Sequence, residues 1–285
     1  MENNTFTISP MNQQIFLYPG QVYEGYININ SSSAADIGFK YQAAVTPYVV
    51  QGPEYSIDLY NESDRNSIVH WIKIEEPVGI VEPNQSKSLK FTITVPENAP
   101  IGGQYATIAV SSNNDTNSQE TATVQSVFEI ASVIYANVNG EIIHDGEIQE
   151  NQIPGFAFSA PISIDATLIN NGNTHETARI TITVTDCFSD QEIIPNGKDN
   201  GIYDEFIMPG TTRHITHEIS DLPSLGVFKI TQSIGYNTHN SYQEKIFIIC
   251  PVWFIALIAI TVVAIISTII ILIKKHRRRK KILPL

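Results

Sequence analysis

The residues of this chain that could perform chemistry are few, and its seven histidines come first, because imidazole is a common metal ligand. His214 and His217 stand three positions apart. In a strand this spacing places the two side chains on opposite faces, so they could not bind one ion together. We therefore expect both to be solvent-exposed strand residues, and we predict no metal site.

A second candidate is Asn196–Glu205 (NGKDNGIYDE), whose acidic and amide side chains resemble those of a calcium-binding loop. Aligning Gly201 with the glycine that such a loop requires places Lys198 at a ligand position, where a cation cannot serve. A hairpin or loop before Pro209-Gly210 is the better interpretation of this segment.

Signatures of catalysis are absent from the sequence, which contains no G-x-S-x-G, no H-E-x-x-H and no phosphate-binding loop. Isolated Ser, His and Asp residues occur, but no known spacing orders them into a nucleophile–base pair. We expect no catalytic residues, no cofactor and no enzyme activity. A membrane-anchored hydrolase with an unrecognised site stays open as an alternative.

The residues that could bind a partner are three tyrosines, Tyr48, Tyr55 and Tyr60. Tyrosine combines an apolar ring with a polar hydroxyl and is frequent in contacts with proteins and carbohydrates. The sequence therefore predicts a surface aromatic patch at these positions. Trp71 begins an apolar strand and could be a ligand platform, but we predict it to be a core residue.

Short strands must position these candidates. The clearest is Leu89–Val95 (LKFTITV), where apolar residues alternate with Lys and Thr in the period-2 pattern of a half-buried strand. Similar patterns cover Tyr23–Ile29, Ile37–Val45, Ile162–Leu168, Ile180–Val184 and Phe228–Ile234. Turn signals separate them, including Pro19-Gly20, Pro83-Asn84, Gly102-Gly103, Asn171-Gly172 and Pro209-Gly210.

These patterns predict an all-β body of two tandem Ig-like antiparallel β-sandwiches, followed by one transmembrane α-helix. The first sandwich is expected at 1–131, with a polar loop at Asn113–Gln119, the linker at 132–139 and the second sandwich at 140–245. Five residues are predicted to be buried in the two cores: Phe91, Ile93, Leu168, Ile182 and Ile230.

The transmembrane helix is predicted at 246–273, a run of 28 uncharged residues that exceeds the roughly 20 needed to span a bilayer. Tyr242 and Trp253 are placed to lie at the headgroups. A basic tail occupies 274–285, and its membrane-flanking residues are Lys274, Lys275, Arg277, Arg278, Arg279, Lys280 and Lys281.

The positive-inside rule places this basic tail in the cytoplasm and the body outside a plasma membrane. That topology requires an export signal, whereas Met1–Pro10 is polar and has no apolar core region. A tail anchor with a cytoplasmic body is the other topology, but it would move seven basic residues across the bilayer.

Charge separates the body from the tail. The chain has a net charge of −12, but seven of its 17 basic residues lie in the tail, so residues 1–245 carry a net charge of −19. Such a body is not expected to bind nucleic acid. The two cysteines, Cys187 and Cys250, are far apart in sequence and are not expected to pair.

Several stretches of the first half combine turn and strand signals: Ile8-Ser9-Pro10, Tyr18-Pro19-Gly20-Gln21, Trp71–Ile74, Val81–Lys87 and Pro96–Tyr105. Together they resemble the N-terminal domain of the WxL-interacting cell-surface proteins. Asn84 replaces the usual glycine of the second turn. In the second half, Leu168–His175 and Met208-Pro209-Gly210 are similar to the domain that follows in that family.

The resemblance implies a bacterial cell-envelope protein that binds peptidoglycan through its first domain and other surface proteins through its second. We therefore expect a membrane-anchored binding or scaffolding protein with an adhesive role, whose partners are a cell-wall polymer or surface proteins, and the lipid bilayer through its helix. The alternative is an assembly helper that resembles pilus chaperones and completes a partner by strand addition. An unpaired, uncharged edge strand would favour that alternative.

Overall fold

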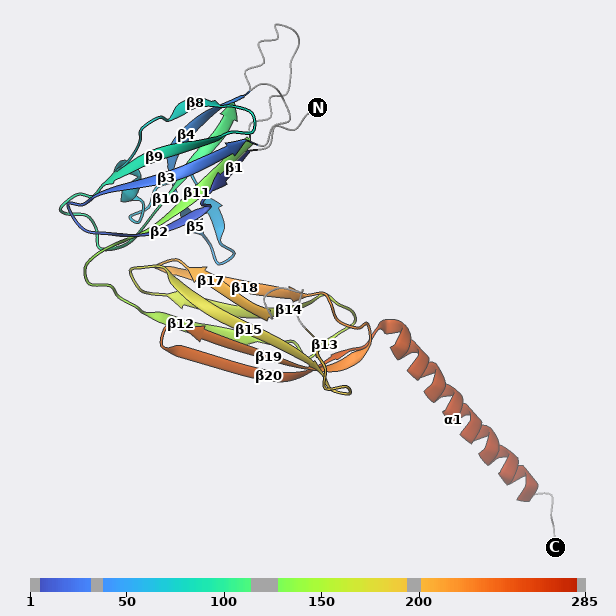
Figure 1. The fold of residues 1–285 in the computed structure, drawn as a ribbon. Coiled ribbons are helices and arrows are strands. Elements are labelled where there is room, and N and C mark those ends of the chain that lie inside the picture. Colours follow the sequence, from blue (N-terminus) through green and yellow to red (C-terminus); the bar gives the residue numbers. More distant parts are fainter. Residues whose placement is uncertain (1–5, 32–37, 114–127, 194–200, 281–285) are drawn as a thin grey trace. The chain divides into compact units, whose positions relative to one another are not determined.

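The computed structural model describes residues 6–31, 38–113, 128–193 and 201–280, and it consists mostly of β-strands with one helix at the C-terminal end (Figure 1). The chain divides into two compact units. Unit 1 contains 1–147 together with Leu168–Thr177 and Phe206–His214, and unit 2 contains the remaining segments up to the C-terminus. Residues 114–119 of the predicted loop at Asn113–Gln119 and the first part of Asn196–Glu205 lie outside the described residues, whereas Asn113 ends a strand.

Two sheets form the first sandwich. The four-stranded sheet has the order β1-β3-β9-β7, and the five-stranded sheet has the order β2-β11-β10-β4-β8. Their bounds are β1 Phe6–Ser9, β2 Asn12–Leu17, β3 Val22–Ser31, β4 Phe39–Pro47, β7 Ile72–Ile74, β8 Val78–Val81, β9 Ser86–Thr94, β10 Gly102–Asn113 and β11 Phe128–Val138. A small hairpin of β5 (Val49–Gln51) and β6 (Ser56–Asp58) and a 3-10 helix at Ser67–His70 complete it.

The core of the first sandwich forms where the inward residues of both sheets meet. Phe91 and Ile93 of β9 are fully buried, as predicted, and Trp71 packs against the same core while remaining partly exposed. Gly25 of β3 lies opposite Phe91, and a Cβ there would approach the Phe91 ring to 2.2 Å. The close approach of the ring to the backbone therefore requires glycine at position 25.

The predicted turns adopt backbone conformations that explain their residue types. Gly20, Asn84 and Gly102 have φ angles of 76°, 56° and 97°. This left-handed region favours glycine and asparagine, since other side chains crowd the backbone there. The turn signals in the sequence therefore report local backbone geometry.

The second sandwich also contains two sheets. A three-stranded sheet has the order β12-β14-β18, and the other sheet has the order β13-β20-β19-β15-β16 with β17 also paired to β15. The bounds are β12 Gly146–Gln152, β13 Phe156–Ala157, β14 Ile162–Asn170, β15 Glu176–Asp186, β16 Glu192–Ile193, β17 Ile202–Ile207, β18 Thr211–Ile219, β19 Gly226–Tyr236 and β20 His239–Ile249. Leu168, Ile182 and Ile230 are fully buried, as predicted.

The expected body of two β-sandwiches is confirmed, but the prediction of purely antiparallel sheets is wrong at two places. Strand β2 runs parallel to β11, and β13 runs parallel to β20. The physical reason is that β1 pairs with β3 in one sheet, after which the chain crosses over and β2 joins the last strand of the other sheet. Parallel pairing of this kind needs a long connection, which here is most of the sandwich.

Strand β11 occupies most of the segment predicted as a linker at 132–139, and the next strand, β12, begins at Gly146. Alternate residues of β11 face opposite sides of the sheet. The residues on the outward face are partly buried, and those on the inward face, including Ile134 and Ala136, are fully buried. Apolar alternation in this segment therefore belongs to the last strand of the first sandwich.

Helix α1 spans Val252–Lys280. Among the described residues, Val252–Lys275 is the one helical stretch long and apolar enough to cross a membrane, judged by length and composition. The apolar run predicted as helix from residue 246 is divided, because Ile246–Ile249 form the end of β20 with Phe247 and Ile249 buried. Of the basic flank, Lys274 and Lys275 are exposed, 277–280 are helical, and Lys281 lies outside the described residues.

Candidate functional site

The three tyrosines predicted as a binding patch differ in exposure, and their joint role in binding stays a prediction. Tyr60 is 89% exposed, whereas Tyr48 and Tyr55 are half-buried. The Tyr48 ring lies edge-on to Tyr135, with 5.8 Å between the ring centroids. The three tyrosines therefore occupy different environments within unit 1.

Tyr55 is engaged by residues 206–214, which belong to the same unit. Its hydroxyl oxygen accepts a hydrogen bond from the backbone N–H of Met208 at 2.8 Å and lies 2.5 Å from the Thr211 hydroxyl. The Arg213 guanidinium lies 4.7 Å from the centre of the Tyr55 ring, a cation–π contact. Burial raises the pKa of Tyr55 above its ordinary value. These contacts give Tyr55 a structural role.

An aromatic cluster in unit 1 contains Tyr105, Tyr135, His175 and Phe206. Tyr135 and Phe206 stack at 5.5 Å, and the His175 backbone N–H donates to the Tyr105 hydroxyl at 2.9 Å. Burial lowers the pKa of His175 to about 4 and raises the pKa of both tyrosines. A neutral His175 ring leaves one nitrogen free to accept from the Tyr105 hydroxyl, which lies 3.3 Å from Nδ1.

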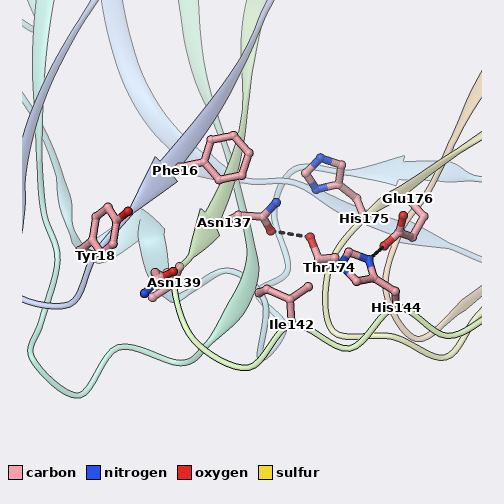
Figure 2. Close-up of a pocket in the computed structure, with 10 residues that line it drawn as sticks. Phe16, Tyr18, Asn137, Asn139, Ile142, His144, Thr174, His175 and Glu176 are labelled. Atoms are coloured by element: carbon pink, nitrogen blue, oxygen red, sulfur yellow. Dashed lines mark hydrogen bonds and ion pairs between the residues drawn. The ribbon is translucent and has the colours of Figure 1, made fainter. Parts of the chain in front are cut away.

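Beside this cluster lies a cavity of about 390 Å³, lined by residues of unit 1 (Figure 2). Its apolar lining includes Phe16, Tyr18 and Ile142, and its polar lining includes Asn137, Asn139, His144, Thr174, His175 and Glu176. Phe16 and Tyr18 are exposed, at 74% and 58%. His144 Nδ1 lies 2.5 Å from a Glu176 carboxylate oxygen. Since the lining holds no Lys or Arg, the cavity suits neutral or cationic groups.

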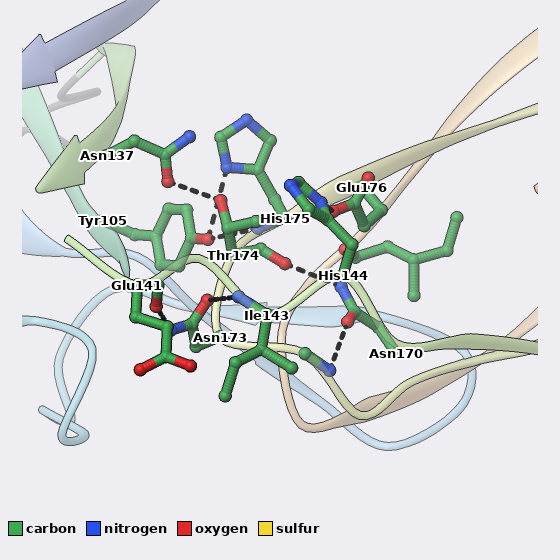
Figure 3. Close-up of polar contacts among 12 residues, drawn as sticks. Tyr105, Asn137, Glu141, Ile143, His144, Asn170, Asn173, Thr174, His175 and Glu176 are labelled. Carbon is green, nitrogen blue, oxygen red and sulfur yellow. Dashed lines mark hydrogen bonds and ion pairs between the residues drawn. The ribbon is translucent and has the colours of Figure 1, made fainter. Parts of the chain in front are cut away.

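Side-chain amides hold the polar wall of this cavity in place (Figure 3). Asn173 Oδ1 accepts from the Ile143 backbone N–H at 2.9 Å, and its Nδ2 donates to the Glu141 carbonyl at 2.8 Å. The Thr174 hydroxyl donates to Asn137 Oδ1. A buried amide, Asn170, donates to the Thr174 carbonyl at 2.8 Å. The wall is therefore built from satisfied polar groups.

Strand β2 forms the edge of the five-stranded sheet next to this cavity. The β11 residues Val133 and Asn139 donate to the carbonyls of Met11 and Leu17. Because both backbone groups of one strand residue point the same way, the odd-numbered residues of β2 face β11. Asn12, Gln14 and Phe16 therefore direct their N–H and C=O groups to the open side. Among the described residues, β2 covers only Val133–Val138 of β11. Residues 128–132 of β11 therefore continue the edge of the five-stranded sheet beyond β2.

Charge distinguishes the edge strands of the two sandwiches. In the first, β1 (FTIS), β2 (NQQIFL) and β8 (VGIV) contain no charged residue, and only β7 carries one, Lys73. In the second, β12, β16, β17 and β18 all contain charged residues, and β13 is two residues long. Because charges on an edge strand discourage pairing with another chain, the first sandwich is the one open to it.

The residues weighed for metal binding are not brought together. His214 and His217 lie in β18, where His217 is buried and His214 half-buried, so the expectation that both are exposed is wrong for His217. The His217 ring stacks on Tyr203 at 4.0 Å. Within the described residues, no group of three His, Cys, Asp or Glu side chains could hold a metal ion.

Gly201 has a φ of 75° and precedes β17, so the described end of Asn196–Glu205 is a turn entering a strand. Both cysteines are free.

Sequence reasoning missed Phe16 and the cavity beside it. The strand Asn12–Leu17 alternates only in its second half, and its first three residues are polar amides, so its pattern was too short to be recognised. The usable signal was an uncharged stretch with a phenylalanine three residues before Pro19 of the Pro19-Gly20 turn. Apart from Tyr18, the residues that line the cavity with Phe16 come from segments more than 100 residues away in sequence.

Comparisons with known proteins find similarity in fold to fimbrial chaperones. A solved chaperone–tip adhesin complex of CFA/I fimbriae biogenesis shares 12% identity, with 87% of this chain and 99% of that chain covered and a TM-score of 0.43. The CsuC–CsuE chaperone–tip adhesion subunit complex of Acinetobacter baumannii shares 14% identity, with 85% of this chain and 98% of that chain covered and a TM-score of 0.42. The E. coli chaperone DraB shares 14% identity, with 86% of this chain and 97% of that chain covered and a TM-score of 0.40. No protein-family model and no curated protein matches this chain.

These findings correct the expected family. The resemblance to WxL-interacting proteins, and the wall-binding and adhesive function that it implied, are wrong, because the comparisons find fimbrial chaperones and no family model matches. The motifs that carried the resemblance include Gly20, Asn84 and Gly102, whose positive φ angles are turn requirements. Such turns recur in unrelated sandwiches and do not identify a family.

Proposed function

We propose that this chain is an assembly helper that binds an extended segment of a surface protein by strand addition at the β2 edge. The observation that carries the proposal is an uncharged edge strand with an exposed Phe16 next to a cavity of about 390 Å³. In strand addition, main-chain hydrogen bonds supply affinity, and pockets for alternate side chains supply specificity.

The backbone geometry supports this binding mode. Asn12, Gln14 and Phe16 direct their N–H and C=O groups away from β11, so an added strand would find three donors and three acceptors. A strand added there would lie about 4.8 Å from β2. Its side chains on the Phe16 face would reach the cavity that Phe16 and Tyr18 line.

The charge of the cavity supports a choice of bound side chain. Glu176 is the acidic group of the lining, and residues 1–245 carry a net charge of −19. A partner strand with apolar residues in alternate positions and a basic or neutral residue at the cavity would fit this environment.

The partner class in this proposal is a surface-protein subunit. Two of the similar solved structures are complexes of a chaperone with a tip adhesin or tip adhesion subunit. We extend that class of partner to this chain as part of the proposal, whose weight rests on the β2 edge.

A binding role without catalysis is part of the same proposal. The cavity lining contains no Ser, Cys or Lys, and its one hydroxyl from threonine, that of Thr174, donates to Asn137. The His144–Glu176 pair therefore has no nucleophile to activate within the lining.

Membrane anchoring completes the proposal. The apolar part of the Val252–Lys275 segment, up to Ile273, spans the bilayer, with the sandwiches outside and the basic residues from Lys274 onward in the cytoplasm. In intact cells, added protease should degrade the body and leave a C-terminal tag protected. Digestion of the tag with survival of the body would reverse the orientation.

Strand addition is tested by a proline substitution at the open edge. The full chain is used to select binders from a display library of extended peptides, and the affinity of each binder is then measured. Gln14→Pro removes one outward N–H without removing a bond to β11, so the fold should survive. Loss of that hydrogen bond should weaken peptide binding at least about fivefold.

The matched control is Ile80→Lys, which places a charge on β8, the opposite uncharged edge of the same sheet. This variant should bind the selected peptides as the unchanged chain does. Equal binding by Gln14→Pro, or loss of binding by Ile80→Lys alone, would contradict addition at β2.

A further inference from the structure

Unit 2 gathers exposed apolar side chains at the end from which α1 departs. Strand β20 ends at Ile249, which pairs with Gly226, the first residue of β19. The Cys187 backbone N–H donates to the Val227 carbonyl at 2.9 Å, so the turn after β15 lies at the same end. Strand β13 pairs there too, with Phe156 opposite Ile248.

Each of these segments contributes a large apolar side chain to the surface. The six residues are between 41% and 81% exposed: Phe156, Phe158, Phe188, Leu225, Ile246 and Ile248. We call them the apolar rim. Phe156 and Phe158 contact each other edge to face at 5.0 Å. Clustered exposed apolar residues of this kind usually mark a binding surface.

The apolar rim is continuous with the apolar helix. The Cys250 backbone N–H donates to the Ala157 carbonyl at 3.1 Å, so β13 is tied to the chain one residue before Pro251. Helix α1 begins at Val252, and three Cα–Cα steps from Ile249 span at most about 11 Å. Val252 and Trp253, at the start of the helix, are also exposed.

We propose that the apolar rim lies in the interfacial region of a phospholipid bilayer and seats unit 2 on the membrane surface. This inference rests on the proposed membrane span of α1. Aromatic residues prefer the headgroup level, and burying each apolar side chain there removes its surface from water. The short connection to α1 leaves the rim no room to lie far from the bilayer.

Charged side chains also lie near the rim, including Asp186, Lys245 and Lys229, which is the register partner of Ile246. Both Phe188 and Ser189 donate backbone N–H groups to the Asp186 carboxylate, at 2.8 and 2.9 Å. The Lys245 ammonium donates to the Ile153 carbonyl at 2.9 Å. Since the rim itself is uncharged, its attraction to lipid should not require anionic headgroups.

The test uses a native cysteine. Cys187 is exposed beside Phe188, so Cys250→Ser leaves one thiol at the rim for a polarity-sensitive fluorophore. The full chain is reconstituted into phosphatidylcholine vesicles, and flotation measures its membrane integration. The label on the reconstituted chain should emit at a shorter wavelength than the same label on the unfolded chain in buffer without detergent. Lipids that carry a quencher near the headgroup should quench the label on the reconstituted chain.

Two variants provide the controls. Phe156→Ser/Phe158→Ser should leave flotation intact while reducing the quenching of the Cys187 label. A label at Thr238→Cys, in a chain with both native cysteines replaced by serine, should not be quenched, because Thr238 is exposed in the turn between β19 and β20, at the end of these strands opposite Ile249.

The outcomes separate this inference from the membrane span. Flotation with an unquenched Cys187 label would overturn the apolar rim as a lipid contact and leave the span in place. Equal quenching in the serine variant would also overturn it. Failure of the chain to float would overturn both the span and the rim.

Discussion

The edge strands of the two sandwiches differ in charge although their cores are alike. In the first sandwich, β1, β2 and β8 present backbone edges without any charged residue. In the second, the edges carry acidic or basic residues such as Glu147, Glu150 and Arg213. An uncharged edge invites pairing with another strand, and proteins usually guard against it. The proposed strand addition at the first sandwich uses this contrast, because its uncharged edges are open to pairing and the charged edges of the second discourage it.

The largest expected effect tests the claim that the two cores are equivalent. Phe91→Ala in the first sandwich and Phe228→Ala in the second each remove a fully buried ring. Each should lower the free energy of unfolding by about 3–5 kcal/mol because a cavity remains. Urea denaturation of the full chain measures both. A loss below about 1 kcal/mol at only one site would show that the cores also differ.

The second effect is a pH dependence centred on His175. The pKa of this residue is about 4 in the folded chain and about 6.5 when unfolded, so the unfolded chain binds the proton first as pH falls. Stability should therefore be constant above about pH 6.5 and decrease by about 2–3 kcal/mol toward pH 4. His175→Gln should flatten this part of the profile.

The control for that profile is His70→Gln, which alters an exposed histidine of the same unit. This variant should keep the part of the slope that burial of His175 causes. A slope that survives His175→Gln would show that burial of His175 within unit 1 does not hold in solution.

A smaller effect separates Tyr55 from Tyr60. Tyr55→Phe removes a hydroxyl that accepts from Met208 and lies 2.5 Å from the Thr211 hydroxyl, so it should cost about 1 kcal/mol. Tyr60→Phe changes an exposed side chain and should alter the melting temperature very little. Equal effects of the two substitutions would show that the Tyr55 hydroxyl contributes no more to stability than the exposed Tyr60 hydroxyl.

The smallest effect is expected when the charged edge strand β12 is made uncharged, like the edge strands of the first sandwich. Glu147→Val/Glu150→Val removes the charges from β12, the edge of the three-stranded sheet. Self-association should increase with protein concentration, because the guarded edge becomes able to pair. Light scattering measures the self-association of this variant and of a matched control, Glu141→Val, whose substitution lies outside any strand. No increase would mean that charge does not protect this edge.

Much of the fold follows from the sequence, because alternation and turn residues are local signals. The strands around Phe91, Leu168 and Ile230 were predicted from period-2 patterns, and each residue is buried. The parallel pairing of β2 with β11 was not predicted, because it joins segments more than 100 residues apart in sequence. The same holds for the cavity, whose walls combine Phe16, Asn137 and Glu176. Local patterns specify which residues turn inward but not which strands become neighbours.

Amide hydrogen exchange of the full chain, with and without a selected peptide bound, decides whether β2 is the binding edge. Strand addition predicts that the amides of Asn12, Gln14 and Phe16 become protected, while those of Gly79 on β8 and Gln149 on β12 exchange as before. Protection at β8 or β12 instead, or no change along β2 despite saturating peptide, would contradict the β2 edge as the binding site.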